Sequence, residues 1–120
     1  MSTEVSGVVA ENIRAVNAHD LEALIATFAA DAYVNDARRQ IDGIDAIRAW
    51  AEKEIIGDSV TIQPRTVTEH YGETIVRGKY DGTYDKTTIA GELIMTNYYR
   101  VVGGKVVSLT VINNRPSEYE

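Results

Sequence analysis

The sequence predicts an α+β fold in which helices pack on one face of a strongly curved antiparallel sheet. Two helical patterns occupy the first 30 residues, and a third follows a short strand. From residue 60 onward, apolar and polar residues alternate between glycine-containing turns. Helices grouped early and strands grouped late are typical of α+β domains. A chain of 120 residues is long enough for one domain with its own core.

The N-terminal part predicts a helical hairpin. Apolar residues recur at a spacing of three to four from Thr3 to Asn17, an amphipathic helix that the amide of Asn12 interrupts. A short turn follows, in which Asp20 is placed to cap a second helix. The apolar face of this second helix is formed by Leu21, Leu24, Ile25 and Phe28. Because the link is short, the two helices are expected to pack side by side.

The next segment contains the most informative polar residues. Ala32 to Asp36 predicts a short strand that ends in the amide of Asn35 and the carboxylate of Asp36. Ile44 to Ile55 predicts a third helix, which carries the lone tryptophan, Trp50. A strand that brings polar groups beside an apolar helix face is one way to build a polar point inside an apolar pocket. This segment therefore favours a small-molecule site over an interaction surface.

The second half of the chain predicts four strands. Their ranges are Val60–His70, Thr74–Tyr84, Leu93–Val102 and Lys105–Asn113. Pro64 predicts a bend or an edge position in the first of them, and Gly103-Gly104 closes a hairpin between the last two. The stretch from Lys86 to Gly91 is expected to be a loose connection, and the tail from Arg115 to Glu120 to be frayed.

Strand parity predicts which side chains face the interior. The less charged face of the second of these strands carries Val76, Gly78, Tyr80, Gly82 and Tyr84. This set belongs inside, and its glycines allow the sheet to curl. In the following strand, Asn97 and Tyr99 share the apolar face, so Asn97 is also predicted to lie inside. The opposite face, with Tyr98 and Arg100, is amphiphilic enough for a dimer contact.

Composition and charge exclude several classes of function. The net charge of -6 and the scattered basic residues argue against nucleic-acid binding, and the one basic doublet, Arg38-Arg39, is interpreted as a solvated turn. The sequence contains no cysteine, which removes disulfides and suits a reducing cytoplasm. It has neither a leader pattern nor an apolar run long enough to span a bilayer. A soluble cytoplasmic protein without a membrane role is expected.

No cofactor is expected either. His19 and His70 have neither a second histidine nor a carboxylate at metal-ligand spacing, so a metal site is not expected. A glycine-rich phosphate loop and a nucleophile elbow are both absent from the sequence.

Asp36 is the candidate catalytic residue. In an apolar cavity it would serve as a general base toward a carbon next to a carbonyl, with Asn97, Asn12 or Tyr80 stabilising the oxyanion. The alternative is a turn aspartate that caps backbone amides. For Asn97 and Asn12, ligand binding and mutual structural hydrogen bonding both stay open. The aromatic rings of Trp50 and Tyr99 are interpreted mainly as core walls.

Several motifs in order resemble the NTF2-like superfamily, in its SnoaL-like, ketosteroid-isomerase-like branch. They are Asn17-Ala18-His19-Asp20-Leu21, Phe28-Ala29-Ala30-Asp31-Ala32, Gly43-Ile44-Asp45-Ala46-Ile47 and Tyr99-Arg100-Val101 before Gly104-Lys105-Val106. The resemblance covers nearly the whole chain as a single domain. It implies a cone: a curved sheet wrapped over helices, a pocket at the open end, and frequent dimerisation through the sheet. It leaves function open, because this superfamily includes isomerases, hydrolases, cyclases, dehydratases and non-catalytic binders.

Two catalytic branches of the superfamily can be compared by residue. In the ketosteroid isomerases, the base is an aspartate at the position of Asp36, while Asn97 and Asn12 lie close to the positions of their oxyanion-binding acid and tyrosine. In the limonene-epoxide-hydrolase branch, a Tyr-x-Asn pair like Tyr33-Val34-Asn35 holds the attacking water. Arg77 could stand for the arginine of that branch's relay. Its two carboxylates are replaced by Lys79 and Val111, so epoxide hydrolysis by that relay is not expected.

The sequence thus leads to three functional hypotheses. The first is a cofactor-independent isomerase, cyclase or dehydratase that acts on a small hydrophobic or carbonyl-bearing molecule, with Asp36 as base. The second is a non-catalytic ligand-binding or assembly module that uses the same cavity. The third is a water-activating hydrolase built on Tyr33 and Asn35. In each case a homodimer through the sheet face is expected.

Overall fold

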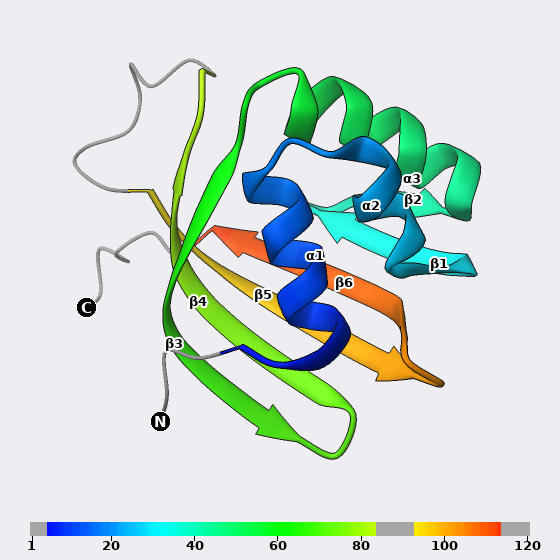
Figure 1. The fold of residues 1–120 in the computed structure, drawn as a ribbon, viewed down its shortest axis with the longest axis vertical. Helices are drawn as coiled ribbons and strands as arrows, with labels where there is room; N and C mark the ends of the chain where they lie inside the picture. Colours follow the sequence, from blue (N-terminus) through cyan, green and yellow to red (C-terminus); the bar gives the residue numbers. More distant parts are fainter. Residues whose placement is uncertain (1–4, 84–92, 114–120) are drawn as a thin grey trace.

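The computed structural model describes residues 5–83 and 93–113, and it shows an α+β fold (Figure 1). A curved, unclosed sheet of six strands carries the helices over one face. The α+β prediction is therefore confirmed. The expectations for Tyr84, for 86–91 and for 115–120 lie outside the described residues. Within the described ranges, every helix is too short or too polar to cross a bilayer.

The two N-terminal helices form the predicted hairpin. Helix α1 (Gly7–Asn17) buries Asn12 among its apolar side chains. Helix α2 (Leu21–Ala26) is capped as predicted, because the Asp20 carboxylate accepts a hydrogen bond of 3.1 Å from the backbone N–H of Ala23. Phe28 was placed on this helix from the sequence, and that placement is wrong. The helix ends earlier, and Phe28 begins the first strand, where it pairs with the last strand of the sheet.

The third helical segment changes its winding partway. Helix α3 (Ile44–Trp50) continues directly into a π-helix, η1 (Ala51–Ile56), so the predicted range of Ile44 to Ile55 is confirmed within one residue. The N–H of Gly57 bonds the carbonyl of Glu52, five residues back, at 2.9 Å. Such wider turns occur often at functional sites.

The sheet has the strand order β2-β1-β6-β5-β4-β3. All neighbouring strands are antiparallel except β1 and β6, which are parallel. The bounds are β1 (Phe28–Asp36), β2 (Arg39–Asp42), β3 (Thr61–His70), β4 (Glu73–Asp81), β5 (Leu93–Val102) and β6 (Lys105–Asn113). The four late strands were predicted, but β4 ends at Asp81, before Gly82.

Two features at the start of the sheet differ from the predictions. Strand β1 begins four residues before the predicted start at Ala32, because its first residue pairs with Val106 in the distant strand β6. Strand β2 was not predicted at all. It returns from β1 through Ala37 and Arg38, which have φ angles of 51° and 73°. Hairpin turns with positive φ usually contain glycine or asparagine, so this sequence gives no turn signal.

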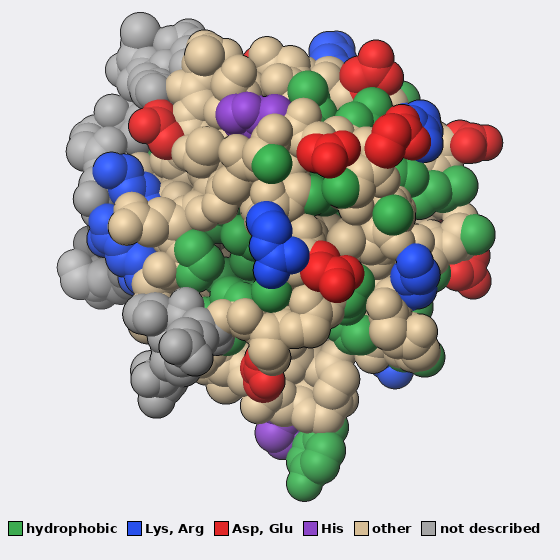
Figure 2. Space-filling model, viewed as in Figure 1, with side chains coloured by type: hydrophobic (Ala, Val, Ile, Leu, Met, Phe, Trp, Pro, Cys, Tyr) green, Lys and Arg blue, Asp and Glu red, His purple; other side chains and the backbone are tan. Residues whose placement is uncertain are grey.

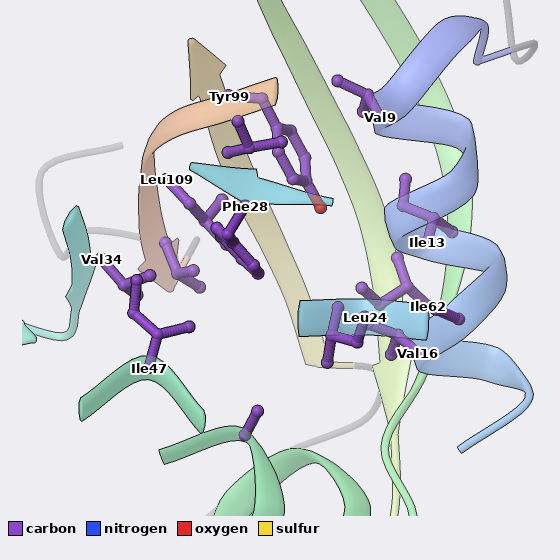
Figure 3. Close-up of a cluster of buried hydrophobic side chains, with 14 of the residues drawn as sticks. Val9, Ile13, Val16, Leu24, Phe28, Val34, Ile47, Ile62, Tyr99 and Leu109 are labelled. Atoms are coloured by element: carbon purple, nitrogen blue, oxygen red, sulfur yellow. The ribbon is translucent and has the colours of Figure 1, made fainter. Parts of the chain in front are cut away.

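The parity of the inner face is confirmed. Val76 and Gly78 on β4 are buried, as are Asn97 and Tyr99 on β5, while Arg77 on the opposite face of β4 is exposed. Side chains from α1, α2, α3 and the sheet point toward one another in this core (Figure 3). The helices therefore cover the concave face of the sheet.

Strand β3 is an edge strand with a bulge, as Pro64 predicts. The register with β4 shifts between Pro64 and Thr66, and β3 is the last strand in the order. Gly78 lies opposite this bulge. A Cβ atom on Gly78 would lie 2.8 Å from the carbonyl oxygen of Gln63, so glycine permits the close strand approach here.

The side chain of Asn17 holds the free edge of β3. Its Nδ2 donates to the carbonyl of Ile62 at 3.0 Å, and its Oδ1 accepts from the N–H of Ile62 at 2.7 Å. The ring Nε2 of His19 lies 3.1 Å from the carbonyl oxygen of Val60. The Asn17-Ala18-His19 turn therefore joins the helical hairpin to the sheet.

Replacing Asn17 with alanine should destabilise the fold, because it leaves two backbone groups of Ile62 without these partners. We expect the free energy of unfolding to fall by about 1–3 kcal/mol, measured by urea denaturation. As a control, Glu11→Ala at an exposed site on α1 should cost less than about 0.5 kcal/mol. Equal effects of the two substitutions would contradict the role of Asn17.

Candidate functional site

A cavity of about 250 Å³ lies between the helices and the concave face of the sheet. Six of its lining residues were predicted as site residues: Asn12, Asp36, Trp50, Tyr80, Asn97 and Tyr99. Its apolar wall is formed by Val16, Leu24, Phe28, Ile55, Val60, Ile62, Leu93, Met95, Leu109 and Val111. The cavity is thus a mostly apolar space with a few polar groups, the usual composition of a small-molecule site.

The floor of the cavity carries a chain of hydrogen bonds that joins the half-buried Tyr80 to buried polar side chains. The Tyr80 hydroxyl donates to Asn97 Oδ1 at 2.8 Å, and Asn97 Nδ2 donates to the Tyr99 hydroxyl at 3.1 Å. The Tyr99 hydroxyl in turn donates to Asn12 Oδ1 at 3.4 Å, and Asn12 Nδ2 donates to Thr27 Oγ1 at 2.9 Å. The mutual structural hydrogen bonding of Asn12 and Asn97, one of the two alternatives, therefore exists, with Tyr99 between them.

The two amides nevertheless retain donor capacity. Each Asn side chain has two N–H groups, and one from each is used in this chain of hydrogen bonds. The second N–H of Asn97, and likewise of Asn12, has no partner among the described residues. Both side chains are about 1% exposed and line the cavity. A carbonyl oxygen in the cavity could satisfy such a donor.

Tyr99 remains a neutral hydrogen-bond donor at physiological pH. Burial raises the pKa of its hydroxyl to about 12, and the hydrogen bond from Asn97 opposes this only in part. Its ring forms part of the core in addition to lining the cavity, as expected.

Asp36 lies at the end of β1, on the inner face of the sheet. In the β1–β6 register it pairs with Val111, another lining residue. Its Oδ2 accepts two hydrogen bonds, from Trp50 Nε1 at 3.0 Å and from an Arg39 guanidinium nitrogen at 2.7 Å. Its Oδ1 has no partner within residues 5–83 and 93–113. One carboxylate oxygen is thus held in place, and the other is available.

Tyr33 and Asn35 lie on the opposite face of β1 and do not line the cavity. They pair with Ser108 and Thr110 of β6, whose side chains share the outer face of the sheet. Asn35 Oδ1 also accepts from the N–H of Arg38 at 3.2 Å, which caps the turn into β2. The structure therefore does not bring the Tyr-x-Asn pair together with Asp36, because adjacent residues of a regular strand face opposite ways.

Arg39 is a site residue that the sequence did not reveal. It was interpreted as part of a solvated turn, but the antiparallel pairing of β1 with β2 places it directly opposite Asp36. Its guanidinium bonds both oxygens of Glu54, at 2.7 and 2.8 Å, and Oδ2 of Asp36. The hydrogen bonds to Glu54, with the two carboxylate charges, raise the pKa of Arg39. The same pairing lowers the pKa of Glu54.

Glu54 and Asp58 complete the polar part of the lining, and neither was predicted as a site residue. Both come from the segment that follows α3, where the π-helix and the turn after it reach the cavity. In the part of the chain that the structure describes, the Asp58 carboxylate has no hydrogen bond or ion pair. The described residues contain no cluster of His, Cys, Asp and Glu suited to a metal ion.

Comparison with known proteins shows the family. The family model of the SnoaL-like domain matches residues 9–109. The chain belongs to the SnoaL-like domain family. This confirms the resemblance, read from the sequence motifs, to the NTF2-like superfamily and its SnoaL-like branch. No curated protein matches this chain.

Solved structures agree with the family fold. A protein of Sinorhizobium meliloti, provisionally assigned as a polyketide cyclase, is 24% identical, with a TM-score of 0.78 over 92% of this chain and 99% of that one. An epoxide hydrolase/cyclase-like enzyme of pyran ring formation in salinomycin is 20% identical, with a TM-score of 0.78 over 89% and 88%. A computationally designed 17-OHP binder is 20% identical, with a TM-score of 0.74 over 89% and 88%. At these identities the likeness shows the fold alone.

The Arg39–Glu54 pair predicts a pH-dependent contribution to stability. Because the pKa of Glu54 is below its ordinary value of 4.5 in the folded protein, the stabilisation is present above about pH 4.5 and is lost as the pH falls through the lowered value. Glu54→Gln should therefore lower the free energy of unfolding at pH 7 by less than about 1 kcal/mol, since the pair is partly exposed. Urea denaturation of both proteins from pH 7 to pH 3 measures this difference.

The difference should shrink as the pH falls through the lowered pKa of Glu54, where the side chain loses its charge. A control substitution, Glu52→Gln, changes an exposed acid on the same π-helix and should show no comparable trend with pH. A difference for Glu54→Gln that stays constant while the Glu54 carboxylate gains its proton would contradict the ion pair as its cause.

Proposed function

We propose that the protein binds a small hydrophobic, carbonyl-bearing molecule in the cavity and catalyses proton transfer on it with Asp36 as general base. The observation that carries this proposal is the arrangement of polar groups in one apolar cavity. A carboxylate with an available oxygen lies on the wall, and buried amides with unused N–H groups lie on the floor. An acceptor for a proton and a donor for an oxyanion are the two groups that enolisation requires.

In this mechanism, Oδ1 of Asp36 takes a proton from the carbon next to the substrate carbonyl. The electron pair of the broken C–H bond forms a C=C bond, and the carbonyl oxygen becomes an enolate oxygen. The unused N–H of Asn97 donates to that oxygen as its charge develops. The Tyr80 hydroxyl, which donates to Asn97 Oδ1, polarises the amide and strengthens its N–H as a donor.

The fate of the enolate sets the reaction class. In isomerisation, Asp36 returns the proton to another carbon of a conjugated enolate. In ring closure, the enolate carbon attacks a second carbonyl of the substrate, and the oxygen of that carbonyl takes the proton from Asp36. In dehydration, the β-hydroxyl takes the proton from Asp36 and leaves as water, while the enolate becomes an unsaturated carbonyl. Trp50 and Arg39 act as positioning residues in each case, since both bond Oδ2 and leave Oδ1 for the substrate.

A second candidate is passive ligand binding in the same cavity. The ion pair of Asp36 with Arg39, which also bonds Glu54, favours this alternative, because it gives the carboxylate a structural task. A hydrolase built on Tyr33 and Asn35 is not supported, since these side chains lie outside the cavity lining.

Hydrogen–deuterium exchange at the α-carbon of a bound ketone separates the two candidates. With 1-indanone in D₂O, the protein should accelerate loss of the α-hydrogen NMR signal. Asp36→Asn should lower that acceleration by about 10²–10⁴-fold, the usual contribution of a general base, and leave the Kd within about threefold. The control Asp42→Asn changes an exposed acid on β2 and should have no effect on exchange.

Binding without accelerated exchange would support the passive alternative. Equal exchange by the parent and Asp36→Asn proteins would exclude Asp36 as the base.

We also propose a homodimer that forms through the outer face of the sheet. Tyr98 on β5 and Ile112 on β6 are 42% and 46% exposed on this face. The β5–β6 register pairs Tyr98 with Thr110 and Thr96 with Ile112, so both apolar side chains lie on adjacent strands. A second copy could cover them with the same surface.

Tyr98→Glu should convert a dimer into a monomer of 13.2 kDa, because it places two like charges in the symmetric contact. Size-exclusion chromatography with light scattering measures the mass. Tyr71→Glu is a matched control, since Tyr71 is 96% exposed but lies in the β3–β4 turn. A parent protein that is monomeric at high concentration would contradict the proposal.

A further inference from the structure

The volume of the cavity limits the size of its ligand. A cavity of about 150 Å³ accommodates benzene. In proportion, 250 Å³ accommodates a molecule of roughly ten non-hydrogen atoms. The cavity cannot deepen easily, since its inner wall consists of core side chains such as Leu24, Ile62 and Tyr99, which are at most 5% exposed. Displacing such side chains would disrupt close packing.

The charges of the lining select against anions. Among the described residues, the lining contains three carboxylates, from Asp36, Glu54 and Asp58, and no lysine, arginine or histidine. Arg39 compensates part of the charge of the first two. Asp58 has no ion-pair partner among residues 5–83 and 93–113. Figure 2 shows acidic and basic side chains on the same face, with several basic side chains gathered at its left edge.

A separate observation points to the polarity of the ligand. The side chain of Asn97 is 1% exposed, lines the cavity, and keeps one N–H without a partner among the described residues. A buried donor of this kind is stabilised when a ligand oxygen accepts its hydrogen bond. A carbonyl oxygen on an otherwise apolar ligand can therefore accept a hydrogen bond from the floor.

From size, charge and polarity together, we infer that the ligand is an uncharged, compact ring compound of about ten non-hydrogen atoms with one carbonyl oxygen. A four-ring steroid is larger than this volume, and a carboxylate would be repelled by the acidic side chains of the lining. This inference rests on the proposed function, because it specifies the ligand of the same cavity. Such a ligand would distinguish this protein from the designed 17-OHP binder, which has a similar fold.

Three probes test the inference: 1-indanone, indane-1-carboxylate and progesterone. Trp50 is the only tryptophan and lines the cavity, so its fluorescence reports binding. The side-chain amide signals of Asn97 and Asn12 in ¹⁵N NMR report occupation of the floor. We expect 1-indanone to shift the Asn97 signal. The carboxylate should bind about tenfold or more weakly, since repulsion between partly buried charges is large, and progesterone should leave the Asn97 signal unchanged.

A variant that removes one negative charge from the lining tests whether electrostatic repulsion selects against anionic ligands. Asp58→Asn should reduce the discrimination between 1-indanone and its carboxylate analogue, measured as the ratio of their Kd values, by about threefold through the loss of one repulsive charge. The matched control Asp45→Asn removes an exposed acid that does not line the cavity and should leave the discrimination as it is.

The outcomes distinguish this inference from the proposed function. If the carboxylate or progesterone shifts the Asn97 signal at the same concentration as 1-indanone, the inference is wrong and the cavity remains a binding site. Equal discrimination in Asp58→Asn and the parent would remove the electrostatic argument. If none of the three probes changes either signal, the proposed function fails, and the inference fails with it.

Discussion

The parallel pairing of β1 with β6 determines how the rest of the site is arranged. Through this register, Val34 is fully buried against the core and Asp36 faces the cavity beside Val111. The same strand then turns into β2 and carries Arg39 back to the carboxylate. A shift of one residue would exchange the two faces of β1. The cavity would then receive Asn35 in place of the only carboxylate that β1 gives to it.

Polar groups in the cavity illustrate a balance between stability and function. A buried amide or hydroxyl is costly unless it is hydrogen-bonded. The Tyr80–Asn97–Tyr99–Asn12 chain satisfies most of these groups internally, which lowers the cost of burying them. It still leaves single N–H groups on two amides. A ligand with one acceptor can therefore be recognised at small cost to the unliganded protein.

The features of the fold that depend on the local sequence pattern could be predicted from the sequence. The third helix, the late strands, the edge position of β3 and the inward direction of Asn97 all follow from periodicity or from one proline. Periodicity could not reveal β2, since its turn uses Ala37 and Arg38 at positive φ and its four residues alternate weakly.

Only part of the candidate site could be predicted, because only some of its residues interrupt a local pattern. Asp36 and Asn97 interrupt apolar patterns and were visible, whereas Arg39, Glu54 and Asp58 are charged residues in polar segments that resemble ordinary surface. Their roles arise from a hairpin register and from a π-helical turn, which depend on contacts distant in the sequence.

The attachment of Asn17 to β3 has a consequence for how copies of the protein can meet. An open edge strand is a template for adding another strand, and long edges promote aggregation. Here the N–H and carbonyl of Ile62 are bonded by Asn17, those of Val60 by Ile55 and His19, and Pro64 has no N–H to offer. The backbone groups of Ile62, and those of Val60 just before the strand, are thus already bonded by Asn17, His19 and Ile55. A strand added by another copy would therefore find no free hydrogen-bonding groups at Val60 and Ile62.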